Sequence, residues 1–419
     1  MPKRYKWYLI TMLWLVCFLN YSDRQAIFAL FPLLRVQFHL SNVQLALIGS
    51  SFMWAYAIFG PVAGWLGDRL SRKWLILAGL IFWLFVTTAT ILAHQFWQLA
   101  ILRSLNGIAE AVYFPAAMSL ISSYHDTTTR SRAMSLHQSA VYAGTIAGGV
   151  VASWLGEHFG WRSNFICFGA LGFLLCIILI LFLREPVSDQ SPNHDIDTGN
   201  AKNPNPSLSE IAKEILGAPP VLRLIIAFIG ANFVAMVFMV WLPTFLYGKF
   251  HMSLAMAGMN ATIYLQIASV FGVLTGGILA DSLATRDGGG RMRTQAFGLL
   301  AGMPFLFLAG QTSSFGWLIF GMIGFGFAKG IYESNIWASL HDVVNPQQRA
   351  TAVGVMNSLG WLGGGFAPIA IAFGSQHFGM GACLSSTSLV YGCVAALLLW
   401  NAHSARSSRH RLKQLSQSR

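Results

Sequence analysis

The feature of this sequence that most limits its possible folds is a series of long apolar runs. Most runs have about 20 residues or more, the length at which an α-helix crosses a lipid bilayer. The runs cover residues 7–35, 43–66, 74–94, 97–124, 133–154, 162–183, 221–247, 254–280, 294–312, 315–341, 350–374 and 380–401. Only 10% of the residues are charged, whereas soluble domains have about 25%. We therefore predict an all-α integral membrane protein with twelve transmembrane helices.

A polar stretch divides these runs into two sets of six. Residues 185–220 are rich in Pro, Asn, Ser and Asp and have little apolar surface to bury, which is typical of a linker with a short surface helix near its end. We predict a six-helix bundle at 1–184, this linker, a second six-helix bundle at 221–402 and a basic tail at 403–419. Because each bundle has an even number of helices, the two are parallel, pseudo-symmetric repeats about an axis along the membrane normal.

The distribution of basic residues predicts the orientation of the chain. If both termini lie on one side, most of the 27 Lys and Arg residues fall in the loops and tails of that side. By the positive-inside rule this side is cytoplasmic, so the net charge of +12 reflects topology and requires no nucleic-acid partner. The first apolar run is too long for a cleavable signal peptide, and we expect it to remain as the first helix.

Six charged residues fall inside the predicted helices: Asp23, Arg24, Arg103, Glu110, Lys329 and Glu333. A charge that faces lipid costs about 3 kcal/mol on insertion scales, so these side chains should face the interior and meet partners or water. Arg103 and Glu110 are seven residues apart and lie on one helix face. Asp23 and Arg24 are adjacent and point in different directions, so at least one of them should reach another helix, with Arg103 or Glu110 as its partner.

A similar phrase recurs in the second set of runs. Gly330 precedes Glu333 as Gly107 precedes Glu110. Lys329 and Glu333 are four residues apart and can pair directly.

A carboxylate and an arginine that share a buried site can couple a proton to an anion. Desolvation raises the pKa of a buried carboxylate and a neighbouring Arg lowers it, so protonation depends on whether that Arg is engaged elsewhere. A substrate carboxylate that occupies the Arg therefore favours protonation of the released acid. The alternative is a set of static ion pairs that hold helices together, which we favour less because ionisable groups within membranes are usually functional.

Two loops resemble the major facilitator superfamily. "GWLGDRLSRK" follows the second run and "GILADSLATR" follows the eighth, each with Gly-x-x-x-Asp and basic residues after it. The first copy resembles the signature loop of that family, with Ser71 in place of the usual Gly. The resemblance implies a transporter that works by alternating access. It assigns gating roles on the cytoplasmic side to Asp68, Arg69, Arg72 and Asp281.

Three further motifs are similar to the anion:cation symporter branch of that superfamily, which includes sugar-acid and sialic-acid carriers. They are "R-x-x-x-G-x-x-E-A-x-x-F-P-A" in the fourth run, "NYSDR" in the first and "WLPTFL" in the seventh. The resemblance implies a proton-coupled symporter of a small organic anion, with a sugar acid or related carboxylate as substrate. It implies proton coupling by Asp23 and Glu110, and binding of the substrate carboxylate by Arg24 and Arg103.

Two features depart from the branch pattern: Ser22, where an apolar residue is usual, and the Lys329/Glu333 pair, which is no hallmark of the branch. Both leave the identity of the substrate open. We place the pair in the substrate site, because a sugar acid needs several polar contacts. The remaining predicted substrate contacts are Tyr21, Tyr56, Gln266, Asn335 and Asn357. For each of these alone, and for His137 as a proton relay, helix packing is the more common role.

Other functions are less consistent with the sequence. A spinster-like lysolipid transporter shares Asp23, Arg103, Glu110 and "GDRLSRKW", and a drug/proton antiporter usually has a Gly-Pro signature in its fifth span, which is missing here. The sequence has no HExxH, GxSxG or Walker motif, so we expect neither an enzyme nor an ATP-driven pump. The five cysteines lie in apolar runs without a CxxC pair, so we expect no metal site. We expect a monomer in the bacterial inner membrane, with protons as the coupling ion and no cofactor.

Overall fold

The computed structural model describes residues 5–67, 70–125, 129–185, 208–286, 289–344 and 349–417, and all regular structure in these ranges is α-helical. The helices of the first half are α1 (Tyr5–Ala29), α2 (Phe31–Phe38), α3 (Asn42–Gly67), α4 (Arg72–Thr90), α5 (Phe96–Tyr124), α6 (Arg130–Phe159) and α7 (Arg162–Phe182). Those of the second half are α8 (Leu208–Gly217), α9 (Pro219–Lys249), α10 (Leu254–Arg286), α11 (Gly290–Gln311), α12 (Phe315–Glu333), α13 (Ile336–Val343), α14 (Arg349–Gly364), α15 (Ala367–Phe378) and α16 (Met380–Gln417).

Ten helical segments in the described ranges are long and apolar enough to cross a membrane. Two of them join consecutive helices, since α12 and α13 form the segment Phe315–Val343 and α14 and α15 form Thr351–Phe378. The long helices outside this set are α1 and α5, with 25 and 29 residues. These two carry four of the charged residues expected inside the membrane. Counted with them, the described chain has twelve long helical segments, which correspond to the twelve apolar runs.

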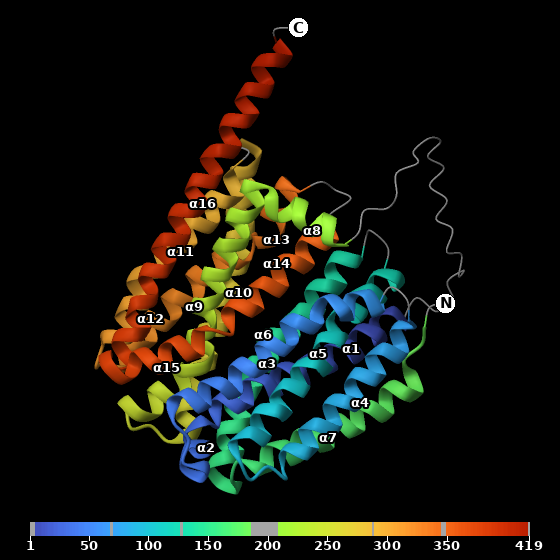
Figure 1. Ribbon diagram of the computed structural model, residues 1–419, viewed down its shortest axis with the longest axis vertical. Helices are drawn as coiled ribbons and strands as arrows, with labels where there is room; N and C mark the ends of the chain where they lie inside the picture. Colours follow the sequence, from blue (N-terminus) through green and yellow to red (C-terminus); the bar gives the residue numbers. More distant parts are fainter. Residues whose placement is uncertain are drawn as a thin grey trace.

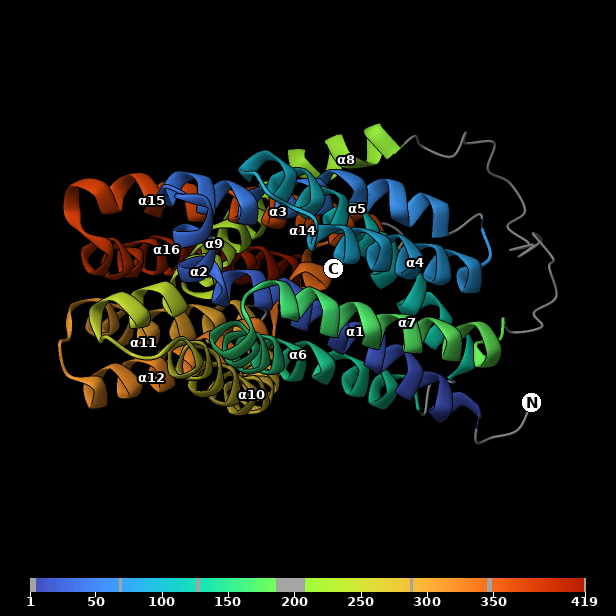
Figure 2. The same cartoon turned by 90° about the horizontal axis from the view of Figure 1, so that it is seen from below.

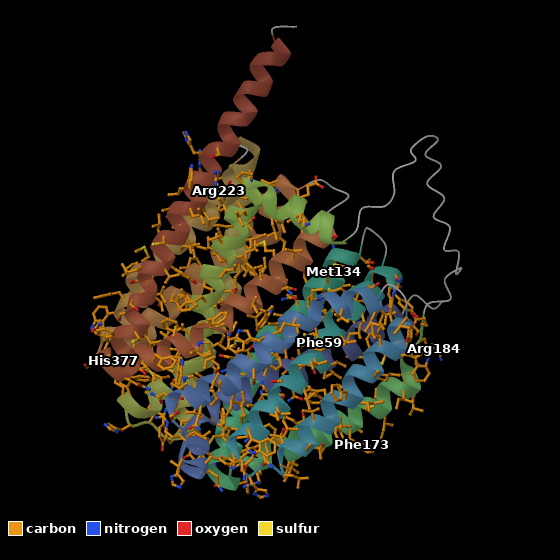
Figure 3. All side chains as sticks on the ribbon, viewed as in Figure 1. Phe59, Met134, Phe173, Arg184, Arg223 and His377 are labelled. Carbon is orange, nitrogen blue, oxygen red and sulfur yellow. The ribbon has the colours of Figure 1, made fainter. Side chains whose placement is uncertain are left out.

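The helices form two groups, α1–α7 and α9–α16, which lie side by side (Figure 1). Within the first group, α1 packs along α6, and α5 packs between α3 and α4. Within the second group, α11 packs along α16 and α12, and α12 also packs on α10. The outer surface is apolar, as a lipid-facing surface requires. An example is Phe173 of α7, which is 60% exposed at the margin of the molecule (Figure 3).

The two groups meet through α3 with α14 and α15, through α6 with α10, and through α1 with α9. They spread apart toward the end where α1 begins and α7 ends (Figure 1), which we call the terminal end. At the opposite end, Asn42 Nδ2 donates to Ser375 Oγ at 3.4 Å, and Glu157 Oε2 accepts a hydrogen bond of 2.6 Å from the backbone N–H of Ala255. We call this the closed end.

The repeated glycines hold neighbouring helices at close range. A Cβ atom on Gly107 of α5 would lie 3.1 Å from Tyr56 N of α3 and closer still to Phe52 O. A Cβ atom on Gly330 of α12 would lie 2.8 Å from Val273 N of α10. Each glycine therefore lets two helices approach until their backbones touch, as small residues do in membrane proteins. The repeated phrase in the sequence corresponds to a repeated helix contact.

The polar stretch between the groups is only partly described. Residues 186–207 lie outside the described ranges, and α8 follows them as the short helix expected near the end of the linker. It packs on α9 and α14 through its buried Ile215, while Lys213 and Glu214 are exposed. Figure 2 shows α8 along the edge of the molecule.

Candidate functional site

Two ion pairs connect α1 and α5 in the interior. Arg24 Nη2 donates to Glu110 Oε2 at 2.6 Å, and Arg103 Nη1 donates to Asp23 Oδ2 at 3.2 Å. All four side chains are at most 5% exposed. Although Asp23 and Arg24 are adjacent and point in different directions, both reach α5, because Arg103 and Glu110 are two turns apart on that helix. The structure thus brings together the four residues that we predicted from the first and fourth runs.

These pairs use only part of the hydrogen-bonding capacity of the four side chains. Six of their buried polar atoms have no hydrogen-bond partner in the described part of the protein: Asp23 Oδ1, Arg24 Nε and Nη1, Arg103 Nε and Nη2, and Glu110 Oε1. A buried polar group without a partner costs about 1–3 kcal/mol. Arginine presents its donors as a planar fork that matches a carboxylate. The free positions of Arg24 and Arg103 are therefore suited to an oxyanion.

Aromatic rings surround the guanidinium of Arg24. Its Cζ atom lies 4.4 Å from the ring centroid of Tyr21, 4.7 Å from Phe52, 5.2 Å from Tyr56 and 4.9 Å from Trp361. Such cation–π contacts stabilise a cation that has lost its water. Tyr21 and Tyr56 were expected here. Trp361 belongs to α14, so a side chain of the second group covers the cation of the first.

Two residues of this site carry no functional signal that we recognised in the sequence. Phe52 lies under both arginines, with its ring centroid 4.9 Å from Arg103 Cζ. Asn106 Nδ2 donates to Asp23 Oδ2 at 3.4 Å. Helical spacing could have identified both residues. Phe52 precedes Tyr56 by four residues, and Asn106 stands between Arg103 and Glu110 on the same helix face.

A small cavity lies beside the Arg24–Glu110 pair, with room for about one water molecule. Its lining residues are Cys17, Asn20, Tyr21, Arg24, Tyr56, Glu110, Tyr113 and Phe114. A sugar acid has more than ten non-hydrogen atoms and does not fit this space. Occupation by such a molecule requires the surrounding rings and helices to move apart.

The second charged pair lies in α12. Lys329 Nζ and Glu333 Oε1 are 2.7 Å apart, as the spacing of four residues predicts, and their side chains are 11% and 31% exposed. This pair stays within one helix, whereas Glu110 pairs with another helix.

The remaining predicted substrate contacts are not among the residues that line the cavity. Gln266 of α10 is 8% exposed and Asn357 of α14 is half-buried. Asn335 Nδ2 donates to Gly276 O at 3.1 Å, which holds α10 against the junction of α12 and α13. This contact is the interhelical hydrogen bond that is common in membrane bundles.

The first signature loop is partly described, since Asp68 and Arg69 lie outside the described residues. Arg72 Nη1 donates to Ser123 Oγ of α5 at 2.5 Å. The carboxylate of Glu185 accepts the backbone N–H of Arg72 at 3.2 Å and that of Lys73 at 2.8 Å. Glu185 therefore caps the positive N-terminal end of α4. The sequence analysis did not identify this cap, although Glu185 is the first acidic residue after the sixth run.

The second signature loop contributes Asp281 to a charge cluster with Arg291 of α11 and Asp342 of α13. Arg291 Nη1 lies 2.8 Å from both carboxylate oxygens of Asp342, and Arg291 Nη2 lies 3.8 Å from Asp281 Oδ1. Arg291 begins α11 as Arg72 begins α4, and Asp342 stands where Ser123 stands in the first half. Asp281 thus contacts a neighbouring helix with a side chain that is 79% exposed, and its gating role stays a prediction. Arg291 and Asp342 were not predicted.

Comparisons with known proteins agree with this architecture. The family model described as Major Facilitator Superfamily matches residues 13–368. A probable galactarate/D-glucarate transporter of Bacillus subtilis is 27% identical over 398 residues, covering 88% of this chain and 85% of that protein. Protein spinster homolog 1 of Homo sapiens is 29% identical over 367 residues, covering 82% and 68%. A solved structure of a bacterial homologue of the human lysosomal transporter Spinster, inward-facing and unoccupied, has a TM-score of 0.81 at 22% identity, covering 97% of this chain and 99% of that one.

Proposed function

Because this chain belongs to the major facilitator superfamily, and is thus a secondary transporter and not an enzyme, we propose that it cotransports protons with a small organic anion. The substrate class is a sugar acid or a related carboxylate. Relatives that align with most of the chain support this class, because they include probable galactarate/D-glucarate transporters and a probable L-galactonate transporter. A single observation carries the proposal: arginines with free donors lie beside a carboxylate in a buried cluster.

The coupling follows from competition for Arg24. The substrate carboxylate accepts hydrogen bonds from Arg24 Nε and Nη1, which have no partner in the described protein. A second anion at the same guanidinium destabilises the ionised form of Glu110, so Glu110 takes up a proton and its bond to Arg24 weakens. Loss of the substrate reverses the sequence. Proton and anion thus bind together, which is the requirement for symport.

Asp23 and Arg103 form the second ion pair of the same coupling site. Arg103 has two unpartnered nitrogens and Asp23 has one unpartnered oxygen. Arg103 binds a second polar group of the substrate, and Asp23 responds as Glu110 does. Lys329 and Glu333 contact the end of the substrate that is distant from Arg24, after the cavity widens. Their partial exposure supports a role that requires access from solvent.

We propose that the bundles at residues 1–184 and 221–402 rock against each other around this cluster. The contact of Trp361 with Arg24 supports this, because it makes the second bundle sensitive to what the first bundle binds. Arg72 and Asp281, with Asp68 and Arg69, close the terminal end in the opposite state. The charge cluster at Arg291 supports such a gate.

The membrane and the orientation of the chain follow from the basic residues. We propose that both termini are cytoplasmic and that the protein lies in a bacterial inner membrane as a monomer. The support is the concentration of Lys and Arg in the loops and tails on the side of the termini. In this orientation the structure corresponds to a state that opens to the cytoplasm.

A lysolipid carrier is the second candidate, and the similarity to human spinster homolog 1 favours it. The cavity beside Glu110 is lined mainly by polar and aromatic side chains. A long acyl chain needs a continuous apolar surface. The free arginine donors favour the short anion.

The test is uptake into liposomes that contain the purified protein. Galactarate, D-glucarate, L-galactonate and a lysophospholipid are offered separately, with and without an imposed inward proton gradient. We expect accumulation of at least one sugar acid against its gradient, and only when the proton gradient is present. Transport of the lysophospholipid alone would support the second candidate. Sugar-acid uptake at a rate that is independent of the proton gradient would refute the proposed proton coupling.

A further inference from the structure

A histidine lies next to the cavity in a position that the proposed coupling does not use. His137 of α6 is fully buried, and its Nε2 atom lies 2.8 Å from the hydroxyl oxygen of Tyr113 of α5. Tyr113 lines the cavity beside Glu110, three residues away on the same helix. The imidazole therefore bonds directly to a wall of the proposed proton site.

The hydrogen bonds of Tyr113 define where His137 carries its hydrogen. The Tyr113 hydroxyl donates to the backbone oxygen of Leu13 at 2.6 Å, and a carbonyl oxygen can only accept. With its own hydrogen used, the Tyr113 oxygen accepts from His137 Nε2–H. The other ring nitrogen, Nδ1, then has a free lone pair. It is buried and has no partner in the described part of the chain.

The surroundings of His137 contain few groups that could hold a proton in its place. Tyr113 of α5 contacts the imidazole directly, and Phe114 packs with its ring centroid 6.2 Å from it. The other titratable side chains around the neighbouring cavity are Cys17, Tyr21, Arg24, Tyr56 and Glu110. No ion pair to His137 is present among the described residues. Protonation of His137 would therefore add a positive charge that has no ion-pair partner of its own. The nearest carboxylate in the neighbouring cavity is that of Glu110.

His137 also lies further along the direction in which a proton would leave. Glu110 is 14 residues before the end of α5 at Tyr124, so it is about 20 Å from the terminal end. His137 is seven residues after the start of α6 at Arg130, about 10 Å from that end. The line from Glu110 through Tyr113 to His137 thus runs toward the terminal end, where the two groups of helices spread apart.

We propose that His137, oriented by Tyr113, is a second proton-binding site that receives the coupled proton from Glu110 and passes it to the terminal end. This inference rests on the proposed proton symport. The transfer is balanced: Glu110 loses a proton and becomes the carboxylate that pairs with Arg24, while His137 Nδ1 gains it and the imidazole becomes an imidazolium. His137 does not line the present cavity, so the transfer uses water that enters when the helices around the cavity move apart, and no other reactant takes part.

The test uses His137→Gln in the full-length protein. Glutamine keeps an N–H donor for Tyr113 but cannot bind the proton. We expect proton-driven uphill uptake to fall by about tenfold or more. Exchange of labelled for unlabelled substrate, which moves no net proton, should stay near the wild-type rate. His158→Gln is the matched control, because His158 is exposed on the same helix near the closed end, and it should leave both rates unchanged.

Two results would overturn the assignment. One is His137→Gln with normal uphill uptake and an unchanged pH profile, while the wild type is proton-driven. The other is equal loss of exchange and uphill uptake in a correctly folded variant, which indicates a packing role.

If the variant does not fold, NMR of wild-type protein labelled with ¹⁵N-histidine replaces it. We expect one buried histidine whose protonation changes when substrate is added, and this signal should be absent from the control titration of Glu110→Gln. A histidine spectrum that does not respond to substrate contradicts the relay. Failure of the symport proposal itself appears separately, as wild-type uptake that is independent of the proton gradient.

Discussion

Arg24 and Glu110 share a single hydrogen bond of 2.6 Å between α1 and α5, although the guanidinium of Arg24 has three nitrogens and the carboxylate has two oxygens. Arg24 Nε and Nη1 and Glu110 Oε1 have no other partner in the described chain. A fork-to-fork pair would satisfy more of these atoms and would be harder to separate. The end-on geometry leaves the arginine able to bind a second anion before it releases the first.

Glu110→Gln should separate proton movement from substrate movement. The amide keeps the size of the side chain but cannot gain or lose a proton, so we expect uphill uptake driven by a proton gradient to disappear. Substrate exchange between the two sides should persist. Both rates are measured in liposomes with labelled substrate. Glu214→Gln, at an exposed position on α8, is the control and should behave as wild type. Uphill uptake by Glu110→Gln at the wild-type level is incompatible with the proposed role.

Arg24→Lys should weaken substrate binding although it keeps the positive charge. Lysine is a point charge and lacks the planar fork that binds both oxygens of a carboxylate. Loss of one charge-assisted hydrogen bond costs about 1.5–3 kcal/mol, so the dissociation constant should rise by roughly 10-fold to 150-fold. Calorimetric titration measures it. Arg223→Lys is the control, because Arg223 lies over Trp400 at the outside of the second group. An affinity equal to wild type in Arg24→Lys would place the anion elsewhere.

Substrate affinity should decrease as the pH rises. In the proposed coupling, binding of the anion takes up a proton on Glu110, so the bound state holds more protons than the free state and is favoured at low pH. If one proton is taken up completely, the dissociation constant increases by up to about tenfold per pH unit. Thermal-shift titrations at several pH values measure this slope. The slope should vanish in Glu110→Gln, and a slope of opposite sign in the wild type would exclude the proposed order of events.

Gly107→Ala should destabilise the protein. The new methyl group would lie 3.1 Å from both Ala55 Cβ and Tyr56 N of α3, and closer to Phe52 O, so the two helices must separate. Overpacking of this kind costs about 1–3 kcal/mol. The separation also displaces Phe52 from beneath Arg24 and Arg103. The melting temperature in detergent reports the effect. Gly64→Ala in α3 is the control, since no atom lies within 4 Å of its added Cβ.

The architecture could be predicted from the sequence because the apolar runs are long and distinct. The segments at 7–35 and 97–124 stand out in the structure as well, since α1 and α5 carry four of the six interior charges and are the two long helices outside the ten candidate spans. Pairing of Lys329 with Glu333 followed from helical spacing alone. Pairing of Arg24 with Glu110 did not, because spacing within a helix does not determine which neighbouring helix lies opposite.

The surroundings of the charges were less predictable. Phe52 and Asn106 are ordinary residues in an apolar run, and only the contact between α3, α1 and α5 gives them a role. Trp361 reaches Arg24 from a helix more than 300 residues later in the chain. Glu185 caps α4 across the first group, a partnership that depends on where α7 ends. Each of these contacts is set by tertiary packing, which local patterns do not encode.

The repeated glutamates have different partners, and this difference makes the two halves of the protein inequivalent. Glu110 reaches from its helix to Arg24, whereas Glu333 turns to Lys329 within its own helix. The two halves therefore contribute differently: the first holds the ion pairs between α1 and α5, and the second contributes Trp361, which covers Arg24. Exchanging the halves would therefore not give an equivalent protein, because the interhelical ion pairs of the interior occur in the first half and the pair within one helix in the second.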